Sequence, residues 1–355
     1  MIVLVYLYCL FSTILYSTNS AFEYHELTTP DNVKIRVGRF CGENTISSSD
    51  KVLFILPGLV SRIERQEFLA QQLASHGYDI WVLEFRGQGE SQRLVSNKQM
   101  IHVDDFGQYI TDVETLASLK QFQNKQISLY AHSMGGQVAL QILKKYPNKF
   151  QLAVLEAPMI RINTSPFPLF FAEPMAYIFK NWLGKSKQYC LTCSDYDPIK
   201  LNFTNNRNCR DKDLFDQYYY IPESKKEMIP SDPSWGWMYT ALTTSRQLLN
   251  NLYLLKPITT KIFFATAGND KVLDTSYDKI VVSSLTKVAH KIYREAYHSL
   301  VHDSLAIRKM FLQDISSFLQ NPDQFVHETR KNAPSSNDIL DWLYKFLHSW
   351  TFKLL

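Results

Sequence analysis

The sequence predicts an α/β protein with a mostly parallel central sheet, helices on both faces of the sheet and an inserted cap domain. Short apolar segments alternate with segments of helical periodicity between residues 51 and 155. Such alternation is typical of a parallel sheet that is covered on both sides. The alternation stops near residue 161 and resumes near residue 261. An interruption that returns to the same sheet indicates an inserted domain.

The composition agrees with one large domain that carries an insertion. The chain has 355 residues, of which 45% are apolar, so a full core can form and global disorder is excluded. The formal net charge is only +4, and the sequence contains no dense cluster of Lys and Arg. We therefore expect no nucleic-acid partner.

The expected elements of the core are short and follow one another closely. Strands are expected at residues 24–28, 33–40, 51–56, 78–85, 127–131, 152–155, 261–266 and 290–294. Helices are expected at residues 66–76, 103–122, 134–146, 277–285 and 304–319. From these elements we assign residues 22–160 and 255–320 to the core and residues 161–254 to the cap.

Residues 1–21 have the character of a signal peptide or an N-terminal anchor. They contain no charged side chain, and an unbroken apolar run from Met1 to Phe11 is followed by small and polar residues. This pattern resembles the apolar part and cleavage region of a secretory signal, although no Lys or Arg precedes the run. We expect export to the periplasm, the envelope or the medium. A buried N-terminal strand or helix is the alternative.

The segment Ala131-His132-Ser133-Met134-Gly135 lies between an expected strand and an expected helix. A nucleophile elbow requires this context, because its serine occupies a tight turn that lifts the hydroxyl above the sheet. The small residues two positions before and after Ser133 let the strand and the helix approach each other. Ser133 is therefore the predicted nucleophile, and His132 is a predicted packing residue whose side chain points away. A serine that only caps the helix is the alternative.

An acid and a base follow Ser133 in the order that the α/β-hydrolase fold uses. Asp270 lies in the turn after the strand at 261–266, and His298 lies in the loop after the last strand. His298 would take the proton of Ser133, and Asp270 would orient the imidazole. Asp274 is the competing acid, but its position is better suited to a helix cap. The predicted fold class is thus the α/β-hydrolase fold.

Two backbone N–H groups are expected to stabilise the oxyanion of the reaction. One belongs to Met134, which follows the nucleophile, and the other belongs to Leu59, in the loop after the strand at 51–56. The mechanism requires no metal and no organic cofactor, so we expect neither.

Four cysteines follow the leader, namely Cys41, Cys190, Cys193 and Cys209. An even number suits an oxidising compartment. Because three of them lie in one irregular segment, we expect Cys190 or Cys193 to pair with Cys209. Zinc binding at Cys190 and Cys193 is a weaker alternative, since no second Cys/His pair stands at a matching distance. Free buried thiols are another alternative.

Four stretches of the sequence resemble bacterial lysophospholipases and monoglyceride lipases. They are ILPGLVSRIERQEFLAQQLASHGYDIWVLEFRGQGES, YAHSMGGQVAL, ATAGNDKVLD and EAYHSL, and the resemblance spans most of residues 50–320. In that family a cap covers an apolar channel for one acyl chain, so the resemblance implies a hydrolase of single-chain lipid esters.

The resemblance also bears on the choice of substrate. Pro57 stands where the monoglyceride lipases have His, which favours lysophospholipid over monoacylglycerol. An esterase of small soluble esters remains an alternative, and so does a non-catalytic binding protein on the same fold.

A polar linker and an amphipathic helix are expected after the core, in residues 321–355. Seven apolar residues between Ile339 and Trp350 fall on one side of a helix that would span residues 338–355. Two roles suit such a helix. It could pack on the core or on a second subunit, or its aromatic side could enter a membrane interface.

Overall fold

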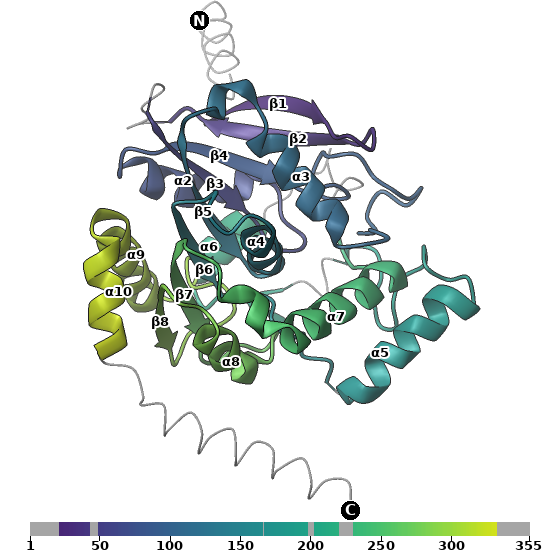
Figure 1. Cartoon of the computed structure of the whole chain (residues 1–355). Helices are drawn as coiled ribbons and strands as arrows, with labels where there is room; N and C mark the ends of the chain where they lie inside the picture. Colours follow the sequence, from purple (N-terminus) through teal and green to yellow (C-terminus); the bar gives the residue numbers. More distant parts are fainter. Residues whose placement is uncertain (1–20, 43–48, 166, 198–201, 220–229, 332–355) are drawn as a thin grey trace, which may run out of the picture.

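The computed structural model describes residues 21–42, 49–165, 167–197, 202–219 and 230–331. At its centre is an eight-stranded sheet with the strand order β1-β2-β4-β3-β5-β6-β7-β8 (Figure 1). The pairs β1–β2 and β2–β4 are antiparallel, and every other neighbouring pair in this sheet is parallel. This mostly parallel topology confirms the predicted fold class.

The strands lie close to their predicted positions. They are β1 (Phe22–Thr28), β2 (Lys34–Phe40), β3 (Lys51–Leu56), β4 (Asp79–Glu84), β5 (Gln126–His132), β6 (Leu152–Glu156), β7 (Lys261–Ala267) and β8 (Val288–Tyr293). Strands β3 to β7 are buried along almost their whole length. Burial on both faces explains why these segments read as continuous apolar runs in the sequence.

Helices cover both faces of the sheet, and each face has its own hydrophobic cluster (Figure 1). One face carries α2 (Glu67–Ala74), α9 (Leu305–Gln320) and α10 (Pro322–Lys331). The other face carries α3 (Gly107–Ala117), α4 (Met134–Lys145) and α8 (Asp278–Ser283). Short helical turns complete the core at η1 (Ile63–Gln66), η2 (Lys120–Phe122), η6 (Leu252–Leu255) and η7 (Thr275–Tyr277).

The helix predicted at residues 103–122 is shorter in the structure. Helix α3 ends at Ala117, and Leu119 has the extended backbone angles φ −60° and ψ 136° before η2 begins. The apolar periodicity continues through this break because Leu116 and Phe122 are both buried in the same cluster.

The cap contains α5 (Leu169–Tyr177), the π-helical turn η3 (Ile178–Trp182), η4 (Phe203–Asn205), α6 (Lys212–Tyr219) and α7 (Trp235–Asn250). Helix α7 fixes the cap to the core, because Trp237 is buried and its Nε1 donates to Tyr109 Oη at 3.1 Å. Helix α5 lies outside α7, on the side away from the sheet (Figure 1).

The core extends beyond the predicted boundary at residue 320. The segment predicted as the start of a polar linker forms helix α10, directly after α9. Phe325 is buried, and its ring lies 5.1 Å from that of Phe263 and 5.7 Å from that of Phe318. These aromatic contacts, together with the ion pair between Asp323 and Lys261 of β7, hold a largely polar segment on the sheet.

Two predictions concern the ends of the chain and fall mainly outside the described residues. The leader was predicted at residues 1–21, and the C-terminal amphipathic helix at residues 338–355. Within the part of the chain that the structure describes, no helix is both long and apolar enough to cross a membrane.

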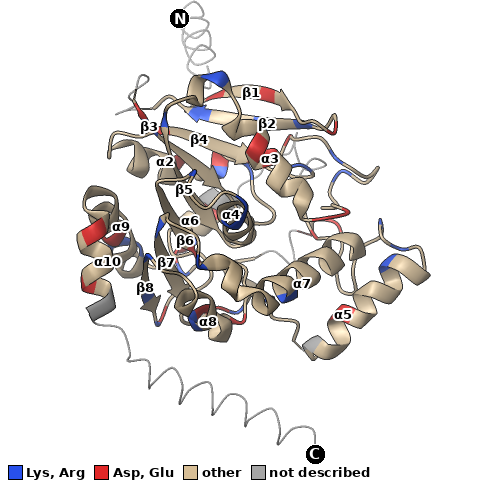
Figure 2. Ribbon diagram, in the orientation of Figure 1, with Lys and Arg blue, Asp and Glu red and all other residues tan. Residues whose placement is uncertain are grey.

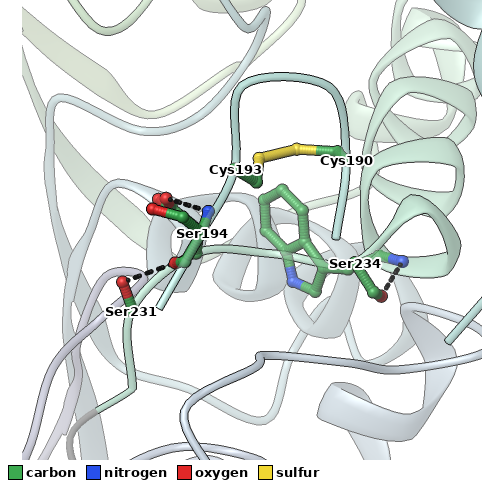
Figure 3. The surroundings of a disulfide bond; sticks show 7 residues. Cys190, Cys193, Ser194, Ser231 and Ser234 are labelled. Atoms are coloured by element: carbon green, nitrogen blue, oxygen red, sulfur yellow. Dashed lines mark hydrogen bonds between the residues drawn. A yellow bond between two sulfur atoms is a disulfide. The ribbon is translucent and has the colours of Figure 1, made fainter. Parts of the chain in front are cut away.

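The predicted pairing of Cys190 or Cys193 with Cys209 is wrong. Cys190 pairs with Cys193, beside the segment from Ser231 to Ser234 (Figure 3). The two cysteines belong to one tight turn, in which Cys193 N–H donates to the carbonyl oxygen of Cys190 at 2.9 Å. Cys209 is buried elsewhere and free. Its neighbour Asn208 bonds to the loop after β8, through the N–H of Ser299.

Candidate active site

Ser133 occupies the sharp turn between β5 and α4, with φ 53° and ψ −117°. A positive φ is uncommon for a residue with a side chain and persists only where the surroundings fix it. Here the N–H of Ser133 donates to Glu156 O at 3.0 Å, and its carbonyl oxygen accepts from Met159 N–H at 2.8 Å. A Cβ on Gly135 would lie 2.0 Å from the carbonyl oxygen of Leu56. A small residue is therefore needed there, as predicted, and the structure narrows the choice to glycine.

The structure brings the three predicted triad residues into one hydrogen-bonded chain. Ser133 Oγ lies 2.8 Å from His298 Nε2, and His298 Nδ1 lies 2.6 Å from Asp270 Oδ2. The residues come from the segments after β5, β7 and β8, so all three lie at the carboxyl edge of the parallel sheet. This geometry allows the imidazole to accept the proton of the serine hydroxyl.

Asp270 is held so that one carboxylate oxygen faces the imidazole. Its Oδ1 accepts the N–H groups of Val272 at 2.7 Å and Leu273 at 2.9 Å, which leaves Oδ2 for His298. Burial opposes ionisation, but His298 and these hydrogen bonds outweigh it and hold the pKa of Asp270 below its usual value. A charged carboxylate in this position can stabilise an imidazolium.

Asp274, the competing acid, caps a helical turn as predicted. Its Oδ1 accepts the N–H of Ser276 at 3.2 Å, at the start of η7. Its Oδ2 lies 3.7 Å from Nε of Arg161. Asp270, and not Asp274, is therefore the acid bonded to His298.

The two segments that carry the predicted oxyanion donors lie beside Ser133. A Cβ on Gly58 would lie 3.1 Å from Ser133 Cβ, so the loop that includes Leu59 passes directly against the nucleophile. Leu59 and Ser133 also line the same pocket. Met134 is the first residue of α4, and the N-terminus of a helix favours negative charge. Both segments are thus close enough to the serine to serve the predicted role.

A buried glutamine, which the sequence did not reveal as a site residue, links the loop after β3 to the start of α4. Gln88 Oε1 accepts the N–H of Ser61 at 3.2 Å, and Gln88 Nε2 lies 3.9 Å from Met134 Sδ. Gln66 Nε2 also donates to Ser61 Oγ, at 3.0 Å. Gln88 belongs to the loop after β4, inside the first stretch that carried the family resemblance. That stretch was the available signal, although it did not single out this side chain.

The prediction that His132 points away from the site is wrong. Its ring lies against that of His298, and both residues line the pocket. Burial lowers the pKa of His132, so its imidazole is neutral beside the site at neutral pH. His132 is therefore a packing residue, as predicted, but the residue that it packs against is His298.

A pocket of about 420 Å³ adjoins Ser133 and His298, and the cap supplies its polar side. The polar cap residues along it are Ser194, Asp195, Asp197, Asn205, Asn206, Arg207, Asn208, Ser231 and Asp232. None of them stands out in the sequence as a site residue, because their approach to the site depends on the path of an irregular segment.

Metal ligation has no support among the described residues. No group of three or more His, Cys, Asp or Glu side chains in those ranges could hold a metal ion. Cys190 and Cys193, the two residues considered for zinc, are bonded to each other.

A mostly parallel sheet with a serine elbow and an adjoining His–Asp pair defines an α/β-hydrolase of the serine hydrolase class. More narrowly, the chain belongs to the serine aminopeptidase S33 family, whose sequence profile matches residues 47–304.

Relatives in this class are similar over most of their length. Lysophospholipase L2 of Escherichia coli strain K12 is 22% identical over 325 residues, which cover 88% of this chain and 89% of the relative. A monoglyceride lipase homolog of Monkeypox virus is 23% identical over 275 residues, or 76% of this chain and 89% of the relative. The fold is similar to that of monoglyceride lipase from Saccharomyces cerevisiae. That comparison has a TM-score of 0.67 at 15% identity and covers 85% of this chain and 96% of the yeast chain.

Proposed function

We propose that this protein hydrolyses single-chain lipid esters, with lysophospholipids as the first substrate and monoacylglycerols as the second. The main support is a pair of hydrogen bonds, from Ser133 Oγ to His298 Nε2 (2.8 Å) and between His298 Nδ1 and Asp270 Oδ2 (2.6 Å). The choice of lipid is supported by the relatives, since the bacterial relative is named a lysophospholipase and the yeast enzyme a monoglyceride lipase.

In the first half of the reaction, Ser133 Oγ attacks the carbonyl carbon of the ester while His298 Nε2 takes the hydroxyl proton. The carbonyl electron pair moves onto oxygen, and the N–H groups of Leu59 and Met134 stabilise the resulting oxyanion. The carbon–oxygen bond to the leaving alcohol then breaks. The alcohol takes the proton from His298, and the acyl group stays on Ser133.

In the second half, water replaces the alcohol. His298 removes a proton from the water, the hydroxide attacks the acyl carbon, and a second oxyanion forms in the same place. Its collapse releases the fatty acid and returns the proton to Ser133. Asp270 keeps the imidazole oriented and stabilises its positive charge in both halves.

A fluorophosphonate probe tests the assignment of the nucleophile, because it labels activated serines covalently. We expect labelling of the wild-type protein and none of Ser133→Ala, together with a loss of esterase activity of at least about 10³-fold. Circular dichroism and the melting temperature should match the wild type. Near-wild-type activity in Ser133→Ala would exclude the mechanism, and absence of labelling in the wild type would favour a binding protein.

A hydrolase of small soluble esters is the second candidate, and the polar cap side of the pocket favours it. Asp195, Asp197 and Asn205 are polar residues that line the pocket, and a small polar ester could bond to such side chains. The lipid proposal places a head group there instead. Rates with esters of increasing acyl length separate the two candidates. The lipid enzyme gains kcat/KM with chain length, whereas the small-ester enzyme does not.

We also propose that residues 1–21 direct export and that the Cys190–Cys193 bond forms in an oxidising compartment. Disulfides persist mainly in such compartments, which supports the two statements together. The test is the mass of the protein recovered from each cell fraction of a producing bacterium. An intact leader on protein confined to the cytosol would contradict export.

A third part of the proposal is membrane contact by residues 338–355. Deletion of residues 337–355 followed by vesicle sedimentation tests it. Unchanged vesicle binding, with a loss of thermal stability or of a dimer, would instead support the packing role.

A further inference from the structure

The cap carries a surface on which large apolar side chains face the solvent. Six such residues lie within a stretch of fourteen, and Trp182 (74% exposed), Phe170 (65%) and Phe171 (60%) are the most exposed. We call the six residues the cap face: Phe170, Phe171, Tyr177, Ile178, Trp182 and Leu183. Soluble monomers rarely gather exposed apolar residues in this way, so the cap face indicates an interaction surface.

Helix α5 and the turn η3 bury their small side chains and expose their large ones. Ala172 and Ala176 are buried in a cluster with Leu242 of α7. Met175 and Phe179 are exceptions, since both are partly buried against this cluster, and the ring of Phe179 is stacked on that of Trp235 at 4.3 Å. A helix that only had to cover the cap would bury its aromatic residues and expose its alanines. The inverted pattern is therefore explained by a partner outside the chain.

The cap face is hollowed as well as apolar. A depression of about 640 Å³ is lined by Phe170, Tyr177, Ile178 and Trp182, together with Tyr239 of α7, Pro174 and the ion pair of Glu173 and Arg246. Tyrosine and tryptophan have an apolar ring with one polar atom, and such side chains suit the boundary between a bilayer and water.

The charges in and just after the cap face are mostly positive. Residues 170–190 contain Lys180, Lys185 and Lys187 but only one acid, Glu173, which gives a net charge of +2. Glu173 is neutralised by Arg246, whose Nε lies 2.8 Å from its Oε1. Figure 2 shows correspondingly little charge along α5 itself. Lysines beside an uncharged aromatic surface match an anionic partner.

We propose that the cap face docks the enzyme on an anionic lipid bilayer, with its aromatic side chains in the interface and Lys185 and Lys187 near the lipid phosphates. Interfacial binding of this kind combines buried apolar area with attraction to anionic lipids. A second copy of the chain fits less well. A symmetric dimer would set the same patch against itself and bring the lysines of both copies together.

Sedimentation with vesicles of phosphatidylglycerol and phosphatidylcholine tests the proposal on the full-length protein. The substitution Ser133→Ala is present in every sample, so that hydrolysis does not alter the vesicles. We expect the double variant Phe170→Ser/Trp182→Ser to lower the partition coefficient about tenfold or more. The double variant Lys185→Glu/Lys187→Glu should lower it as well, mainly at low salt.

Matched controls replace residues of similar exposure outside the cap face. Tyr253 is 66% exposed in η6 and Leu305 is 53% exposed at the start of α9, so Tyr253→Ser/Leu305→Ser should bind vesicles like the parent protein. Melting temperatures of all variants should agree, because every replaced side chain is at the surface. A spin-labelled lipid should quench the parent protein but quench Trp182→Phe less.

Three results would overturn the proposal. The first is vesicle binding that the cap-face variants leave unchanged. The second is a dimer that the same variants dissociate, which would make the face an interface between copies of the chain. The third is binding that disappears only on deletion of residues 337–355. With Ser133 restored, the cap-face variants should hydrolyse a short soluble ester at the parent rate. Failure of the proposed hydrolysis is thereby distinguished from failure of docking.

Discussion

The imidazole rings of His132 and His298 lie against each other, with centroids 5.0 Å apart and planes inclined by 50°. His132 Nε2 is also 3.4 Å from the carbonyl oxygen of His298. His132 is the last residue of β5, directly before Ser133, whereas His298 belongs to the loop after β8. The contact therefore braces the position of the base relative to Ser133, and His132 acts as a positioning residue.

Removal of this brace should reduce turnover more than substrate binding. We expect His132→Ala to lower kcat about tenfold and to change KM little, because a weak hydrogen bond and a ring contact are lost. His132→Phe retains the ring and should recover part of the loss. Steady-state kinetics on a soluble ester measures both variants. An unchanged kcat in His132→Ala would mean that the loop after β8 holds His298 without help.

Asp270 and Asp274 provide a matched pair of acids four residues apart. Asp270→Asn removes the charge bonded to His298 and should lower kcat/KM by about 10³–10⁴-fold. Asp274→Asn alters the cap of η7 and the ion pair with Arg161, neither of which touches His298, and should stay within about threefold of the wild type. The same ester assay compares the two variants. The reverse order of damage would show that the acid is misassigned.

The elbow should not tolerate a side chain at Gly135. An added methyl would meet the carbonyl oxygen of Leu56 at 2.0 Å. We expect Gly135→Ala to lower the free energy of unfolding by at least about 2 kcal/mol, because neither the backbone of α4 nor that of β3 can move without disrupting its packing. The control is Gly107→Ala, since the atom nearest to an added methyl there is the movable tip of Asp105. Urea unfolding compares the two variants, and equal stability would contradict the tight elbow.

Asp278 should make the protein less stable as the pH rises. It is 2% exposed, and burial raises its pKa from an ordinary value of 3.8 to about 8. Between these values the folded chain holds a proton that the unfolded chain has lost. The free energy of unfolding therefore falls from about pH 4 to about pH 8 through this group.

Asp278→Asn should remove the decrease in the free energy of unfolding that Asp278 causes between about pH 4 and about pH 8. The asparagine still offers Thr266 a polar partner. Urea unfolding at pH 5 and pH 8 tests the expectation, with Asp274→Asn as a more exposed control. The variant should gain stability over the wild type mainly at pH 8. A gain of the same size at pH 5 would mean that Asp278 is ionised in the folded protein throughout.

The Cys190–Cys193 bond closes a short loop and should contribute modestly to stability. The two residues are separated by three positions, and a loop of that length corresponds to about 2 kcal/mol in the chain-entropy model. Cys190→Ser/Cys193→Ser should lose about this amount, whereas exposed Cys41→Ser should lose almost none. Peptide mapping without reductant identifies the pair directly. A Cys190–Cys209 or Cys193–Cys209 peptide would contradict the structure.

The parts of the site that could be predicted are those fixed by local sequence. Ser133 stands out because the strand, the tight turn and Gly135 are neighbours in the chain. Asp270 and His298 could be placed because each follows a strand of the same parallel sheet, and such strand ends meet at one edge.

The parts that could not be predicted depend on contacts between distant segments. Cys190 and Cys209 are close in sequence, but a tight turn sets Cys190 beside Cys193 instead. Gln88 joins the loop after β3 to the start of α4, which only the folded sheet brings together. Helix α10 resembles a linker because its sequence is polar, yet Phe325 packs on the sheet and Asp323 pairs with Lys261 of β7.

Because the cap is inserted between β6 and β7, Ser133 is separated from its partners by a long stretch of chain. During synthesis Ser133 leaves the ribosome well before Asp270 and His298, and β8, which precedes His298, is the edge strand of the sheet. A nascent chain therefore carries a serine that has no base, even if its N-terminal part has begun to fold. The hydrolysis proposed above therefore requires the chain at least as far as the loop after β8, and a chain that ended before this loop would lack His298.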